Sequence, residues 1–141
     1  MGKINMQRVL LGGLLAGLVL NVVDFVLYGV LWKDDLAAAM AALNKPPISD
    51  SAIPLFVALD FVYGIVLVWT YAAIRPRFGP GPRTAVYAGL LVWVVAGLLH
   101  FIGEMPMGIW PQRIAVMGTL VFLVMAPLAT AVGAKFYQEA A

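Results

Sequence analysis

Four long apolar segments separated by shorter polar connections dominate the pattern of residues along the chain. We place them at residues 9–32, 53–74, 84–104 and 114–136. Each is long enough to cross a hydrocarbon core of ~30 Å as a helix that rises ~1.5 Å per residue. Lipid offers no hydrogen-bond partners, so each segment must satisfy its own backbone, which an α-helix does. The pattern predicts an all-α integral membrane four-helix bundle, with residues 1–141 as a single domain.

Composition favours the same class. The chain is 63% hydrophobic and 11% charged, with a mean hydropathy of +0.96, whereas soluble domains carry roughly 25% charged residues. A soluble fold of this size has too much surface to hide so many apolar side chains. Lys3 and Arg8 precede the first segment as they would in a signal peptide. No small-residue cleavage site follows, so we interpret this segment as a retained span.

The connection between the first two segments, residues 33–52, is the longest. Residues 36–43 (LAAAMAAL) contain strong helix formers, and Pro46 and Pro47 follow them. We expect a short interfacial helix that ends before the prolines.

The basic residues predict the orientation. Six of the nine fall on one side of the membrane if the spans alternate, namely Lys3, Arg8, Arg75, Arg77, Arg83 and Lys135. The positive-inside rule then places both termini in the cytoplasm. The short turn between the second and third spans carries Arg75, Arg77 and Arg83, which we expect to contact lipid headgroups.

Four ionisable residues lie within the apolar segments and in their outward halves: Asp24, Asp60, His100 and Glu104. A charge at the bilayer centre costs ~2.5–3.5 kcal/mol even on a lenient insertion scale, so these residues need a reason to be there. Small and polar residues at steps of three or four share their helix faces, as in helix-packing faces; Gly13 and Gly17 before Asp24 are examples. We therefore expect them to meet inside the bundle, with hydrogen-bonding support from Asn21, Tyr28 and Tyr63.

This cluster admits three interpretations. The first is a proton or small-ligand site of a transporter-like protein, because two adjacent carboxyl groups can hold a proton between them. The second is a metal site, in which His100 and Glu104 at i, i+4 join Asp24 and Asp60. The third is interhelical hydrogen bonding without a ligand, as in a non-catalytic accessory or scaffold subunit of a larger membrane complex.

Several function classes lack support in the chain. There is no cysteine, which excludes disulfides and thiol chemistry. No nucleophile elbow, phosphate-binding glycine loop or two-histidine zinc helix occurs, so we assign no catalytic residue, and nothing indicates an enzymatic reaction. No basic run with interleaved aromatics indicates nucleic acid as a partner. The cofactor, if any, is not encoded in a recognisable motif.

Two stretches carry a resemblance: YAAIRPRFGPGPRTA at residues 71–85 and WKDDLAAAMAALN at residues 32–44. Together they resemble a group of uncharacterised small bacterial four-span inner-membrane proteins. The resemblance extends over most of the chain and implies a bacterial inner-membrane location. It implies no activity and no site residues. We expect a transporter-like or ligand-binding protein in the lipid bilayer. Four spans are few to enclose a transport pathway, so we also expect further copies of the chain or a larger complex as partners.

Overall fold

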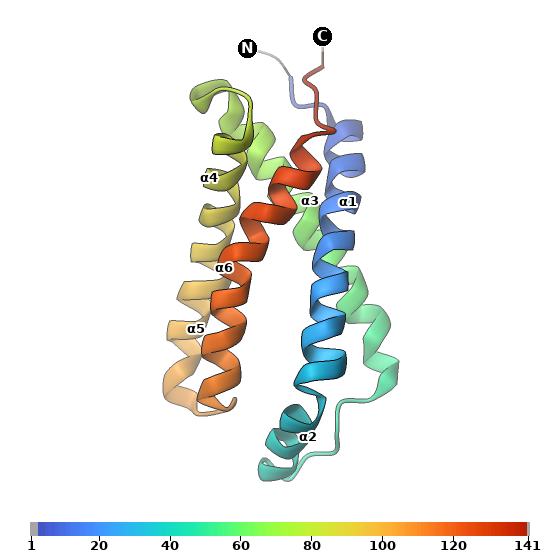
Figure 1. Cartoon of the computed structure of the whole chain (residues 1–141), viewed down its shortest axis with the longest axis vertical. Helices are drawn as coiled ribbons and strands as arrows, with labels where there is room; N and C mark the ends of the chain where they lie inside the picture. The colour runs from blue at the N-terminus through green and yellow to red at the C-terminus, as the bar shows by residue number, and fades with distance from the viewer. Residues whose placement is uncertain (1–2, 141) are drawn as a thin grey trace.

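The computed structural model describes residues 3–140, which form helices and turns without strands (Figure 1). Four helical stretches are long and apolar enough to cross a membrane, at Met6–Leu31, Asp50–Phe78, Pro82–Met107 and Gln112–Ala134. They confirm the four predicted segments and extend most of them by a few residues. The bounds of the helices are α1 Met6–Asp24, η1 Phe25–Leu31, α2 Lys33–Ala42, η2 Asp50–Ala52, α3 Ile53–Phe78, α4 Pro82–Trp93, η3 Val94–Leu98, α5 Leu99–Glu104, η4 Met105–Met107 and α6 Gln112–Ala134.

Two of the four spans change to π-helix partway along. In the first span η1 follows α1 directly after Asp24, and in the third η3 follows α4 after Trp93. A π-helix has wider turns than an α-helix, so each change shifts the angular position of every later side chain.

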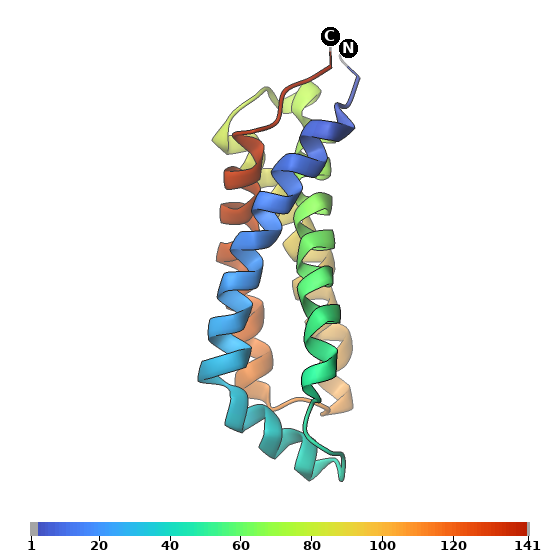
Figure 2. The same cartoon turned by 90° about the vertical axis from the view of Figure 1, so that its right-hand side faces the viewer.

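The spans form a ring of two closely packed helix pairs. α1 packs against α3, and α4 packs against α6, while α1–α6 and α3–α4 contacts close the ring. The two chain ends lie together at one end of the bundle, as an even number of spans requires (Figures 1 and 2). We call this the terminal end, and the opposite end, where α2 lies, the loop end.

Glycine contacts hold the helices close together in the half of the bundle nearer the terminal end. A Cβ on Gly12 of α1 would lie 2.5 Å from the carbonyl oxygen of Gly133 of α6, and one on Gly13 would lie 2.6 Å from the Cα of Ile65 of α3. Gly89 of α4 lies equally close to the backbone of α6. Small residues thus let the backbones touch, as is usual between helices in lipid.

Buried side chains concentrate in that same half. The core includes Val9, Leu67, Val68, Ala88 and Ala129, each at most 1% exposed. By contrast, residues 25–31, 53–63, 94–104 and 115–125 contain no buried residue. The four spans are therefore tightly packed near the terminal end and loosely packed toward the loop end.

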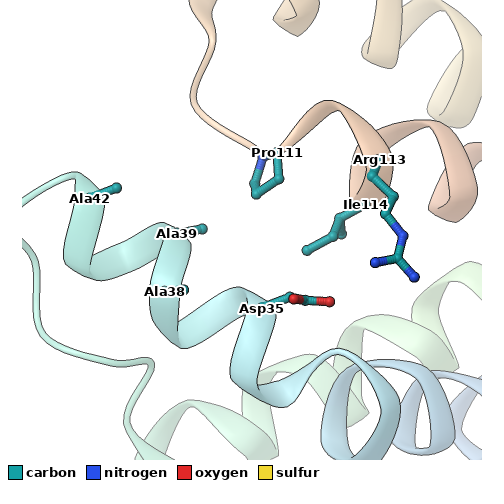
Figure 3. A pocket seen from close by; sticks show the side chains of 7 residues that line it. All are labelled: Asp35, Ala38, Ala39, Ala42, Pro111, Arg113 and Ile114. Atoms are coloured by element: carbon teal, nitrogen blue, oxygen red, sulfur yellow. The ribbon is translucent and has the colours of Figure 1, made fainter.

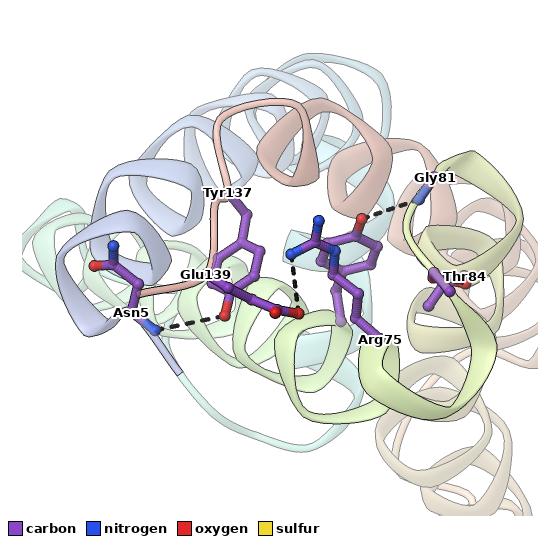
Figure 4. Close-up of polar contacts among 8 residues, drawn as sticks. Asn5, Arg75, Gly81, Thr84, Tyr137 and Glu139 are labelled. Atoms are coloured by element: carbon purple, nitrogen blue, oxygen red, sulfur yellow. Dashed lines mark hydrogen bonds and ion pairs between the residues drawn. The ribbon is translucent and has the colours of Figure 1, made fainter. Parts of the chain in front are cut away.

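The terminal end is closed by polar and aromatic contacts (Figure 4). Arg75 of α3 forms an ion pair with Glu139 at 3.1 Å and lies over the ring of Tyr137, 5.5 Å from its centroid. The Tyr137 hydroxyl accepts a hydrogen bond from the backbone N–H of Asn5, and its ring packs edge-on against Tyr71. This network joins both chain ends to α3.

The first connection contains a short helix over most of the residues where the sequence predicts one. α2 spans Lys33–Ala42 and ends before the two prolines, and it lies obliquely to the spans at the loop end (Figure 2). Trp32 and Ala39 are each 8% exposed, so this helix packs on the bundle through one side.

Candidate functional site

Asp24 and Asp60 come together between the first helix pair. Asp24 is the last residue of α1, and Asp60 lies in the part of α3 nearer the loop end. Their carboxyl groups lie close to each other across the α1–α3 interface. Two neighbouring carboxylates repel each other, which favours a proton held by the pair. Both residues are partly exposed and lie where the tightly packed half of the bundle gives way to the loose half.

Asn21 fixes the relative position of these two helices. Its side-chain amide donates a hydrogen bond to the Gly17 carbonyl at 3.0 Å and a second to the Val57 carbonyl of α3 at 3.3 Å. Both acceptors are backbone groups, so Asn21 supports the carboxyl pair through helix packing and does not bind it directly.

Tyr28 and Tyr63 extend from the first helix pair to α6. A Cβ on Gly118 of α6 would lie 3.0 Å from the Tyr28 hydroxyl, and the Tyr63 ring packs edge-on against Phe122 of α6 with centroids 6.1 Å apart. Tyr28 also packs edge-on against Trp32. The two tyrosines thus place aromatic surface and one hydroxyl group across the loosely packed half, close to the carboxyl pair.

His100 and Glu104 form a separate pair on α5. The imidazole Nε2 lies 3.3 Å from a carboxyl oxygen of Glu104, and the His100 side chain is 63% exposed. No three histidine, aspartate or glutamate residues among residues 3–140 are arranged to hold one metal ion. The structure therefore brings together the two aspartates, and separately His100 with Glu104, but it does not gather all four.

Several residues near the site were not assigned to it from the sequence. The Trp93 indole donates a hydrogen bond to the Thr119 carbonyl at 2.8 Å, which links α4 to α6. Phe122 and Gly118 meet the two tyrosines. The repeat of Gly89, Trp93 and Gly97 marks Trp93 as a packing residue, but no pattern in the chain distinguishes Gly118 or Phe122 from lipid-facing neighbours.

Two open grooves lie outside the carboxyl pair. One, of about 330 Å³, lies at the loop end between α2 and the start of α6, where Asp35 and Arg113 face the same hollow (Figure 3). The other, of about 470 Å³, is apolar and lies between α3 and the α4–η3 segment, with Val62, Tyr63 and Val95 among its lining residues.

The arginines of the turn between α3 and α4 differ in their contacts. Arg75 is held by Glu139 and Tyr137, whereas Arg83 donates a hydrogen bond to the Tyr87 hydroxyl at 2.7 Å and is itself exposed. Arg77 is exposed at the end of α3. The turn is held in shape by Thr84, whose hydroxyl donates to the Gly79 carbonyl at 2.7 Å, and by Tyr71, whose hydroxyl accepts from the Gly81 N–H (Figure 4).

The class of protein that this fold defines is a multi-pass helical membrane protein. Comparison with known protein families, curated proteins and solved structures finds no match. The assignment of a function therefore depends on the geometry of the site.

Proposed function

We propose that this chain is a bacterial inner-membrane protein, with both termini in the cytoplasm, that holds a proton, a cation or a small ligand between α1 and α3 in the outward half of the bundle. Asp24 and Asp60 are the acceptor groups. Asn21, Tyr28 and Tyr63 position them. With this site, the protein acts as a transporter-like or ligand-binding protein.

One observation carries the proposal: two carboxyl groups from different spans lie next to each other inside the apolar region. A single interhelical contact could be made by neutral side chains at a smaller desolvation cost, since ionisable groups inside a membrane are expensive. A pair of carboxyl groups, unlike a pair of amides, can release its proton and accept a cation in its place.

The packing of the bundle supports access from the outward side. The half nearer the terminal end is filled by the buried core and closed by the Arg75–Glu139–Tyr137 contacts. The half nearer the loop end has no buried residue within the four ranges given above. Water and small solutes would meet less resistance on the outward side of the carboxyl pair than on the cytoplasmic side.

The basic turn supports the orientation. We propose that Arg77 and Arg83, which are exposed at the terminal end, contact anionic headgroups of the cytoplasmic leaflet, each contributing ~1 kcal/mol of surface attraction. Arg75 belongs to the same basic turn, but its contacts with Glu139 and Tyr137 leave less of its guanidinium for lipid.

Native mass spectrometry of the detergent-purified protein, with the Asp24→Asn/Asp60→Asn variant beside it, tests the proposal. The substitution retains the shape of both side chains and removes their capacity for charge. We expect the wild-type protein to carry an added mass, such as a metal ion or small molecule, or to take one up when it is supplied, and the folded variant to lose it. If neither protein carries or takes up an added mass and the variant is less stable, the pair is instead structural, as in an accessory subunit.

A further inference from the structure

The His100–Glu104 pair lies on a surface that the bundle itself does not cover. The side chains are 63% and 37% exposed, and the third span continues past them to Met107. His100 is thus a polar residue that faces away from the bundle within the apolar span. Ionisable side chains within spans almost always face protein or water and not lipid, so this surface needs a partner.

The surface continues as the apolar groove between α3 and the α4–η3 segment. Leu91 and Val95 line that groove. In η3 the N–H of Leu99 donates to the carbonyl of Val94, five residues earlier. Side chains five residues apart therefore lie on about the same side of the helix at this point. His100 therefore lies on the same side as Val95, and Glu104 follows one α-helical turn later.

We infer that this surface, made of the groove and of the His100–Glu104 pair, is the interface with a second copy of the chain in a parallel two-fold dimer. In a two-fold interface each residue pair occurs twice, with the roles exchanged. A histidine and a glutamate one turn apart are self-complementary in this arrangement, because His100 of each copy can meet Glu104 of the partner subunit. A lipid chain would fill the apolar groove but would leave the polar pair facing hydrocarbon.

Packing considerations agree with this occupant. Helices in lipid gain little from burying apolar surface, and their association depends on close packing and interhelical hydrogen bonds. The groove is a concave apolar hollow with a volume of about 470 Å³. The ionisable pair provides the polar contacts at its loop-end edge.

Cross-linking tests the interface. The chain contains no cysteine, so an introduced cysteine is the only thiol that can react. Val95 and Val124 are matched positions, since both are valines near the middle of their spans and are 59% and 63% exposed, but Val124 lies on a different helix, α6. In vesicles, iodine dissolves in the bilayer and oxidises two neighbouring thiols to a disulfide, so it should link Val95→Cys protomers into dimers and leave Val124→Cys protomers unlinked.

A second variant pair separates the interface from folding. Val95→Trp places a bulky ring in the groove of each copy, and His100→Leu/Glu104→Leu removes the polar contacts while it leaves the monomer's buried core unchanged. We expect the dimer dissociation constant in bilayers to rise at least tenfold for both variants and to stay within twofold for Val124→Trp. A monomeric wild-type protein, cross-linking through Val124→Cys in place of Val95→Cys, or unchanged dimers in both variants would overturn the inference. Binding to Asp24 and Asp60 is measured separately, so either result stands without the other.

Discussion

Gly64→Ala offers the sharpest test of the packing that holds the carboxyl pair together. A Cβ at Gly64 would lie 2.8 Å from the Cα of Gly17 and closer still to the Gly13 carbonyl oxygen and the Gly17 nitrogen. Ordinary Cβ contacts begin at 3.4 Å, and all three atoms belong to the backbone of α1, which cannot rotate away. α1 and α3 must therefore separate.

The expected cost follows from the cost of overpacking a close-packed interior. Inserting one methyl group into such a contact costs about 1–3 kcal/mol, and with three backbone atoms in the way we expect the upper part of this range. Gly64 lies one helical turn from Asp60, so the separation of the helices also lengthens the contact between Asp60 and Asp24. Gly64→Ala should therefore reduce both the free energy of unfolding and the affinity of the Asp24–Asp60 site for what it binds.

Gly103→Ala is the matched control. Gly103 lies in α5, and a Cβ there would have nothing within 4 Å. Alanine is a better helix former than glycine by about 0.5–1 kcal/mol, so this variant should be as stable as the wild type or slightly more stable. Titration of both variants from mild detergent into sodium dodecyl sulfate, followed by far-ultraviolet circular dichroism, gives the two free energies. If Gly64→Ala unfolds at the same point as Gly103→Ala, the close packing of α1 on α3 is refuted.

Two further substitutions probe contacts elsewhere in the bundle. Arg75→Gln removes a partly exposed ion pair and a cation–π contact, worth together about 1–2 kcal/mol; the same titration should show this loss, and Arg77→Gln should change the free energy of unfolding by less than about 0.5 kcal/mol. Trp93→Phe removes the hydrogen bond to α6 and should cost about 0.5–1.5 kcal/mol, whereas the exposed Trp69 should tolerate phenylalanine; equal effects at Trp69 and Trp93 would contradict the assignment of that contact.

The spans could be predicted from sequence because hydropathy is a local property. Each apolar segment reports its own length and depth without reference to its neighbours, so the bounds agree with the structure to within a few residues in most cases. The glycines at positions 13 and 17 also predicted a packing face correctly, since both are buried against α3.

The angular arrangement of the polar residues could not be predicted in the same way. Depth placed Asp24, Asp60, His100 and Glu104 in one half of the membrane, but which of them meet depends on the rotation of each helix. The π-helical turn at η3 changes that rotation for His100 and Glu104, and no sequence pattern marks it. These two side chains face away from the bundle, whereas Asp24 and Asp60, which lie on α-helical turns, face each other.

The close approach of α1 to α6 depends on tertiary structure as well. Gly12 and Gly133 touch through their backbones, yet they are separated by almost the whole chain. A glycine in an apolar helix is common, and only the ring of helices shows which glycines meet.

The measurement that tests the central claim most directly is the reaction of single cysteines with a membrane-impermeant thiol reagent added from outside intact cells or oriented vesicles. Thiols react quickly only where water reaches them, because the thiolate is the reactive form. Asp60→Cys should react from the outward side, and Val124→Cys, which is 63% exposed on the outer face of α6, should remain unmodified in lipid. A site at Asp60 that stays unreactive until the protein is denatured, or that reacts only from the cytoplasmic side, would contradict an outward-accessible carboxyl pair.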